Sequence, residues 1–197
     1  VCVAASRLLI ERSIHRDFVD RVIAHAAAMR VGDPLDLRTN AGAIASEAQM
    51  DAILADCDRA AAQGAELRMG GSRIAVETGG YYIGPTLFDN APQSSALVQQ
   101  EVFGPVLAVQ PFDTEDEAVA LANGTPYGLA AAVFTRDISR AHRMVSRLRA
   151  GVVHVNTYGG ADVTVPLGGH GQSGNGHDKS PHAMDKFRNL KTAWIQL

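Results

Sequence analysis

Residues 129–155, LAAAVFTRDISRAHRMVSRLRAGVVHV, contain the strand, helix and strand that decide the fold. The apolar run at residues 129–135 has the length of a strand, residues 139–149 have the pattern of a helix, and Gly151 ends that helix. A second apolar strand follows at residues 152–155. Strands without polar alternation are typical of positions buried on both faces of a sheet. This order therefore predicts a β-α-β unit with two parallel strands.

The rest of the chain repeats this alternation of short strands and longer helices. Ser13 is the expected N-cap of the first helix. Ser46 and Thr114 each begin a capping-box pattern, in which a glutamine or glutamate follows three residues later. The alternation predicts an α/β fold with a mainly parallel sheet flanked by helices. The predicted strands lie at residues 7–11, near Leu67, at 81–88 with a break at Pro85, and at 104–112, and the predicted helices at 13–30, 46–64, 114–123 and 181–188.

The composition argues against several classes of protein. The 18 Lys and Arg residues against 21 Asp and Glu residues give a net charge of −3, without the basic excess that a nucleic-acid binder needs. No apolar run approaches the ~18 residues of a membrane-spanning helix. Two cysteines are too few for a disulfide scaffold, so we expect an intracellular, cytoplasmic protein.

Both ends of the chain have unusual sequences. The first residues enter a strand-like segment directly and without an initiator Met, so we expect a fragment of a longer protein. Residues 190–197 read as an isolated amphipathic strand. A single strand is not stable alone, so this one is expected to pair within the chain or with a partner.

Cys2 is the first candidate for chemistry. The small residues Ala4, Ala5 and Ser6 follow it and leave room for a substrate to approach a thiolate. A buried, unreactive cysteine is the alternative, because cysteine is among the most buried residue types.

Glu101 and Phe103 form a second candidate site. In an extended segment, residues two apart point to the same side. A carboxylate there can bind a ribose diol, and an aromatic ring can stack on a flat ring. The alternative is a solvated glutamate beside a core phenylalanine.

The third feature is the glycine-rich stretch at residues 159–176. Glycines allow close backbone approach and positive φ, but the spacing is not the dinucleotide fingerprint G-x-G-x-x-G. A plain surface loop is the alternative. His170, His177 and His182 lie on or beside this stretch without a second cluster of ligands, so we predict no metal site.

Together these motifs resemble the aldehyde dehydrogenase family. Residues 1–7 (VCVAASR) are similar to the segment that carries the family's nucleophile, and residues 101–106 (EVFGPV) to its Glu-x-Phe-Gly-Pro motif. Residues 123–129 (NGTPYGL) are similar to its Asn-x-x-x-Tyr-Gly-Leu motif. The resemblance runs along the whole chain. It implies a catalytic domain at residues 1–189 and an oligomerisation strand at 190–197, with the cofactor-binding domain outside this sequence.

The resemblance implies oxidation of an aldehyde to an acid through a thioester on Cys2, with NAD or NADP as the hydride acceptor. Glu101 would hold the nicotinamide ribose hydroxyls, and Phe103 would pack beside that ribose and ring. Gln49 aligns with a residue that contacts the adenosine ribose, although its place in a capping box explains it equally well.

The resemblance also implies a substrate tunnel and a branch of the family. Leu167 replaces a common Phe, and small residues at 159 and 161 suggest a roomy entrance. Residues 156–158, 163–166 and 172–180 are most similar to dehydrogenases of γ-glutamyl-aminobutyraldehyde and other ω-amino aldehydes. The residues expected to line the tunnel are Asn156, Gly159, Ala161 and Leu167.

Assembly and activity are separate expectations. The resemblance implies a homodimer or homotetramer formed through residues 190–197, with a small aldehyde as substrate. The family's general-base Glu and oxyanion-binding Asn align upstream of Val1, and loss of one oxyanion donor lowers rates by ~10²–10³. The alternative is therefore a non-catalytic assembly module of the same fold. A thiol hydrolase would need a Cys–His pair, which the sequence does not place.

Overall fold

The computed structural model describes residues 2–160 and 162–197. The chain divides into two compact units, Val1–Thr125 and Pro126–Leu197, and each is described by itself. The boundary expected at residue 189 stays a prediction.

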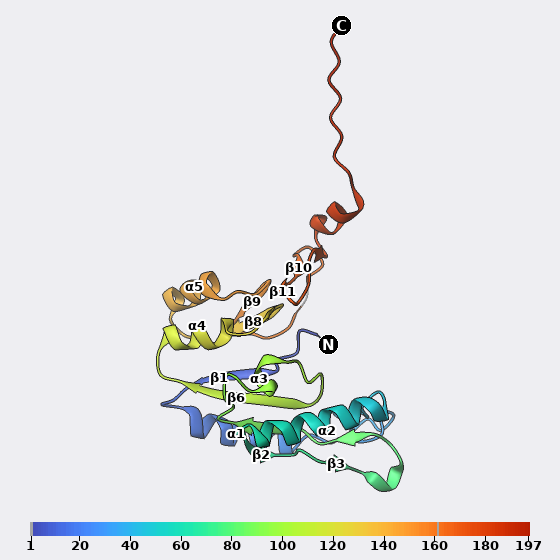
Figure 1. The fold of residues 1–197 in the computed structure, drawn as a ribbon, viewed down its shortest axis with the longest axis vertical. Helices are drawn as coiled ribbons and strands as arrows, with labels where there is room; N and C mark the ends of the chain where they lie inside the picture. The colour runs from blue at the N-terminus through green and yellow to red at the C-terminus, as the bar shows by residue number, and fades with distance from the viewer. Residues whose placement is uncertain (1, 161) are drawn as a thin grey trace. The chain divides into compact units, whose positions relative to one another are not determined.

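A four-stranded sheet forms the centre of the first unit (Figure 1), and its strand order is β1-β6-β5-β2. The β1–β6 and β5–β6 pairs are parallel and the β2–β5 pair is antiparallel. This confirms the predicted α/β fold with a mainly parallel sheet. The extended segment at 81–88 breaks at Pro85, as predicted, into β4 and β5. The strands are β1 (Arg7–Glu11), β2 (Glu66–Met69), β5 (Thr86–Asp89), β6 (Val106–Phe112), and the separate antiparallel pair of β3 (Arg73–Ile74) and β4 (Tyr82–Ile83).

Two helices of this unit, α2 and α4, begin at a short polar side chain that accepts a backbone hydrogen bond. Ser46 accepts from Gln49 N and Thr114 accepts from Glu117 N, which confirms both predicted caps. The cap expected at Ser13 is wrong. The residues before α1 form a turn closed by Ile14 N and Glu11 O, so the helix begins one residue after Ser13 could cap it. The helices are α1 (His15–Ala27), α2 (Glu47–Ala62), α3 (Ala96–Gln99), α4 (Glu115–Asn123) and the 3-10 turn η1 (Val76–Thr78).

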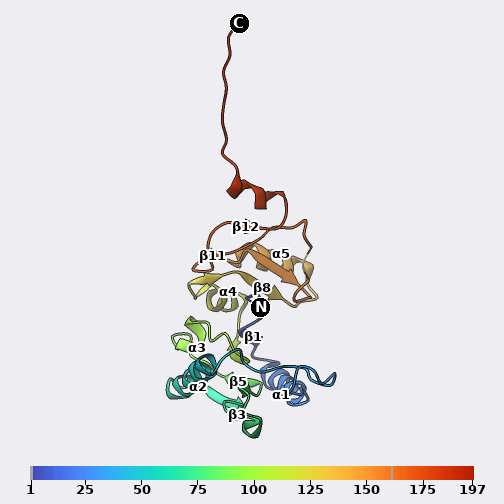
Figure 2. The ribbon, with the colours of Figure 1, turned by 90° about the vertical axis from the view of Figure 1, so that its right-hand side faces the viewer.

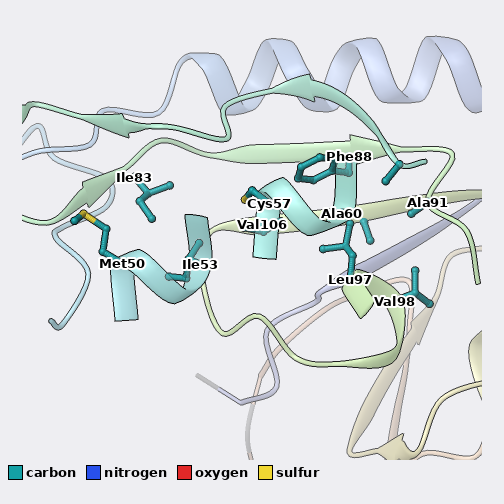
Figure 3. Packing of buried hydrophobic residues seen from close by; sticks show 12 residues of the cluster. Met50, Ile53, Cys57, Ala60, Ile83, Phe88, Ala91, Leu97, Val98 and Val106 are labelled. Atoms are coloured by element: carbon teal, nitrogen blue, oxygen red, sulfur yellow. The ribbon is translucent and has the colours of Figure 1, made fainter. Parts of the chain in front are cut away.

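Helices α1 and α2 cover opposite faces of the sheet (Figure 2). Successive strand residues point to opposite faces. Phe88 on β5 therefore packs with residues of α2, whereas its neighbour Leu87 packs with Val19 of α1. The larger core lies on the α2 face (Figure 3), and its members from α2 are Met50, Ile53, Cys57 and Ala60.

The second unit contains the predicted β-α-β unit. Strands β8 and β9 are parallel, with Ala130 opposite Val152, and α5 connects them. Asp137 caps α5 by accepting from Ser139 N, so the helix begins one residue before the predicted start at Ser139. The elements are β7 (Tyr127–Gly128), β8 (Ala130–Val133), α5 (Ile138–Arg147), β9 (Val152–Val155), β10 (Leu167–Gly168), β11 (His170–Gly171), β12 (His177–Asp178) and the 3-10 helix η2 (Pro181–Phe187).

Residues 190–197 form no strand within the described chain, and the large apolar side chains there are exposed. Trp194 is 92% exposed. Among the described helices, none is both long enough and apolar enough to cross a membrane.

Candidate active site

The parallel pairing of β1 with β6 determines where the first two candidate motifs lie. Arg7 pairs with Ala108, and Ser6 O accepts a hydrogen bond of 3.0 Å from Ala108 N. Cys2 stands five positions before Arg7, and Phe103 stands five positions before Ala108. Both segments therefore enter neighbouring strands from the same edge of the sheet. The topology brings the candidate nucleophile and the candidate cofactor motif to one edge.

The two cysteines occupy opposite environments. Cys2 is exposed in a turn, so the alternative of a buried thiol does not apply to it. Cys57 is 4% exposed in the core beneath the sheet. Burial, with a smaller contribution from the charges of Asp56 and Asp58, raises the pKa of Cys57 to about 11. At pH 7 only ~10⁻⁴ of Cys57 is therefore the reactive thiolate.

Arg7 anchors the segment that follows Cys2, a contact that sequence reasoning missed. Its guanidinium donates to Leu121 O at 2.9 Å and to Ala122 O at 2.8 Å. These carbonyl groups belong to the last turn of α4, where a cation is favourable. Burial lowers the pKa of Arg7 from its ordinary value. A charged residue at the start of a buried strand was the available signal, since such a residue needs a specific partner.

The segment that carries Glu101 and Phe103 is exposed and is not a regular strand. Phe103 is 61% exposed, so its expected alternative as a core residue is wrong. Its backbone has φ of +54°, in the left-handed region that bulky residues rarely adopt. Because of this irregular backbone, strand alternation does not set the relative directions of the two side chains.

Gln49 lies against this segment from the first turn of α2. Its Nε2 donates to Val102 O at 3.4 Å and to Phe103 O at 3.3 Å. Its backbone N donates to Ser46 Oγ at 3.2 Å. The backbone of Gln49 thus takes part in the predicted cap, while its side chain reaches the candidate cofactor motif.

Gly104 lets the same segment approach α2 closely. A Cβ atom at this position would lie 2.7 Å from Cδ1 of Ile53, which is fully buried. Any side chain here would force the segment or Ile53 to move. The helix therefore supports the segment both through Gln49 and through this packing.

The residues expected to line a substrate tunnel belong to the second unit. Asn156 has φ of +54°, and its amide ties the ends of β8 and β9 together. Its Oδ1 accepts from Thr135 N at 2.8 Å and its Nδ2 donates to Thr135 O at 2.9 Å. Leu167 begins β10 and pairs with Asp178. Ala161 lies outside the described residues.

Gly159 opens onto a surface hollow of the second unit. It has φ of +84°, and a Cβ atom there would meet nothing within 4 Å. Nearby, the rings of His154 and Tyr158 lie 5.7 Å apart, and burial raises the pKa of Tyr158. The hollow is lined by Val152, His154, Gly159, Gly160, Asp162, Val163 and Val165.

Metal ligation has no support in the described part of the chain. Residues 2–160 and 162–197 contain no group of three or more His, Cys, Asp or Glu side chains placed to hold an ion.

Comparison with known proteins identifies relatives along the whole chain. The model of the aldehyde dehydrogenase family matches residues 1–193. The NADP/NAD-dependent aldehyde dehydrogenase PuuC of Escherichia coli K12 is 45% identical over all 197 residues. A betaine aldehyde dehydrogenase of Rhizobium leguminosarum bv. trifolii is 41% identical over 99% of the chain. The chain spans 39% and 40% of these two relatives.

Solved structures give the same result. The P. syringae indole-3-acetaldehyde dehydrogenase AldA, a cysteine-to-alanine mutant in complex with NAD⁺ and IAA, has a TM-score of 0.97 and 50% identity. The aldehyde dehydrogenase KauB of Pseudomonas aeruginosa has a TM-score of 0.96 and 49% identity. Each comparison covers the whole of this chain and 40% of the other.

Proposed function

The chain belongs to the aldehyde dehydrogenase family, and from this premise we propose that it is the catalytic-domain part of an NAD(P)-dependent enzyme that oxidises an aldehyde to a carboxylic acid. One observation carries the proposal. The β1–β6 register brings the exposed Cys2 and the exposed segment of Glu101 and Phe103 to the same edge of one sheet.

Cys2 is the proposed nucleophile. Its thiolate forms a bond to the carbonyl carbon of the aldehyde, and the electrons of the broken π bond move to the oxygen. Loss of a hydride from that carbon leaves a thioester on Cys2. Water then attacks the thioester, the C–S bond breaks, and the acid and one proton are released with Cys2 restored as a thiolate. Bound NAD or NADP supplies the acceptor for the hydride and its two electrons.

Residues on the neighbouring segment fit the cofactor. The exposed carboxylate of Glu101 can accept hydrogen bonds from the nicotinamide ribose hydroxyls. The exposed Phe103 ring offers an apolar face beside that ribose and ring. Gln49, expected to contact the adenosine ribose, is within hydrogen-bond reach of the same segment.

The proposed substrate is an ω-amino or γ-glutamyl-amino aldehyde, and the resemblance to the family makes Asn156, Gly159, Ala161 and Leu167 its proposed binding residues. The open surroundings of Gly159 support a roomy entrance. Named relatives act on different aldehydes, including betaine aldehyde and indole-3-acetaldehyde. A panel that contains these two and several ω-amino aldehydes tests the substrate, and the ω-amino aldehydes should give the highest kcat/KM. A higher value for either of the other two would reject this class.

The catalytic proposal is tested by exchanging the two cysteines separately in the complete natural polypeptide. Cys2→Ala should lower aldehyde-dependent NAD(P)H formation by at least ~10³-fold, because it removes the covalent route. Cys57→Ala, the matched control in the core, should keep turnover. Iodoacetamide should also label Cys2 before Cys57. Retained turnover in Cys2→Ala would reject the proposal.

The chain is also proposed to form a homodimer or homotetramer through residues 190–197. The exposure of Leu190, Trp194, Ile195 and Leu197 supports this, because a run of exposed apolar side chains marks an interaction surface. Assembly alone would also be expected of a non-catalytic module of the same fold. A measurement of aldehyde turnover in the complete polypeptide distinguishes the dehydrogenase from that alternative. A cytoplasmic location belongs to the same proposal and is supported by the free state of both cysteines.

A further inference from the structure

Phe103 holds a conformation that needs external support. Phe103 has φ of +54°, and a bulky residue in this left-handed region persists only where surrounding contacts impose it. Its own ring contributes little of that support, because the side chain is 61% exposed. The support must therefore act on the backbone of the segment.

The side chain of Gln49 acts on this backbone. Its Nε2 carries two hydrogens and reaches two consecutive carbonyl oxygens, those of Val102 and Phe103. These carbonyl groups flank the φ and ψ angles of Phe103. The position of Gln49 is itself fixed, because Ser46 Oγ caps its backbone N.

We propose that Gln49 is a positioning residue, whose amide donates to the carbonyl groups of Val102 and Phe103 and keeps Phe103 and Glu101 presented to the cofactor. This inference rests on the proposed function of those two residues. It differs from the role that the resemblance implies, since Gln49 acts through the segment as a donor. A residue that binds ribose hydroxyls with its side-chain oxygen acts as an acceptor.

Two substitutions in the complete natural polypeptide distinguish the role of Gln49 as a donor to the segment from a role as an acceptor for ribose hydroxyls. Gln49→Glu keeps the side-chain length and an acceptor but removes both donors. Gln49→Lys keeps donors and removes the acceptor. Gln63→Glu, at the other end of α2, is the matched control, because Gln63 uses its oxygen to accept from Ala96 N and a carboxylate keeps that contact.

The measurements are the Kd for NAD⁺ by calorimetry and hydrogen exchange of residues 101–104 without cofactor at short labelling times. Gln49→Glu should speed exchange and raise the Kd, each by at least about fivefold, because both hydrogen bonds to the segment are lost. Gln49→Lys should speed exchange and raise the Kd less than Gln49→Glu does, because it keeps donors for the two carbonyl groups. Gln63→Glu should stay within about twofold of the native protein.

Thermal unfolding excludes a general structural effect. A glutamate three residues after Ser46 completes a capping box, so Gln49→Glu should keep or raise the melting temperature while it weakens cofactor binding. The inference is overturned if Gln49→Glu binds NAD⁺ as tightly as the native protein, if Gln49→Lys binds it as weakly as Gln49→Glu, or if exchange at 101–104 is unchanged.

Failure of the proposed function gives a different result. If the native polypeptide binds neither NAD⁺ nor NADP⁺, the dehydrogenase proposal fails. The exchange rates in the cofactor-free protein still show whether Gln49 holds the segment. If cofactor binds but exchange does not respond to Gln49→Glu, only the positioning role fails.

Discussion

At the scale of single residues, the surroundings of the two cysteines separate one thiol suited to chemistry from one suited to packing. Cys2 lies exposed among small residues, whereas Cys57 is enclosed by the core on the α2 face. Burial is the main cause of the raised pKa of Cys57, and two neighbouring aspartates add to it. Reactivity therefore follows position in the fold, because the two side chains are chemically identical.

The pKa of Cys57 predicts how stability depends on pH. Its pKa rises from 9.0 in the unfolded chain to about 11 in the fold, so between these values the folded state binds more protons. The free energy of unfolding should then fall as pH rises from 9 to 11, by on the order of 2 kcal/mol from this group. Urea titrations of the native protein and Cys57→Ala measure the difference. A native protein whose stability falls no faster than that of Cys57→Ala would contradict the prediction.

At the scale of secondary-structure elements, the candidate site depends on contacts between the end of one element and the start of another. Arg7 at the start of β1 ties that strand to the end of α4, and Gln49 at the start of α2 ties that helix to the segment before β6. In the second unit, Asn156 ties the ends of β8 and β9 together. Side chains at element ends therefore fix the backbone from which the candidate residues project.

Replacing Arg7 tests one of these ties. Arg7→Met keeps an unbranched apolar stem but removes the guanidinium that donates to Leu121 O and Ala122 O. The free energy of unfolding should fall by about 1–3 kcal/mol. Arg12→Met is the control on the same chain segment, because Arg12 pairs with Asp113 in an exposed position and should matter much less. Urea titration compares the two, and an equal loss in both would contradict the assigned role of Arg7.

The sequence predictions are correct where a feature depends on residues nearby in the sequence, and they fail where it depends on residues far apart in the sequence. The caps at Ser46 and Thr114 depend on atoms three residues away, and both were predicted. The start of α1 depends on the turn that leaves β1, and Ser13 was wrongly assigned. The contact from Gln49 to Phe103 spans 54 residues and depends on how α2 packs against the sheet, so no local pattern contains it.

At the scale of the whole molecule, residues 190–197 are the proposed link between copies of the chain. Deletion of this segment from the complete polypeptide should convert the oligomer to monomers or aggregates, because it removes four exposed apolar side chains. Light scattering coupled to size exclusion measures the mass. Substituting Lys191→Ala in the same segment is the control and should leave the mass unchanged. An unchanged oligomer after the deletion would reject this interface.

The parallel pairing of β1 and β6 also determines which charged groups lie at the edge of the sheet where Cys2 and Phe103 are found. In open α/β sheets, ligands commonly bind beyond the carboxyl ends of the strands, where helices begin and attract phosphate groups. The segments that contain Cys2 and Phe103 precede their strands and so lie at the opposite edge. There α4 ends, and Arg7 is already engaged by its last carbonyl groups. Neither the end of α4 nor Arg7 is therefore available to neutralise a diphosphate at this edge of the sheet.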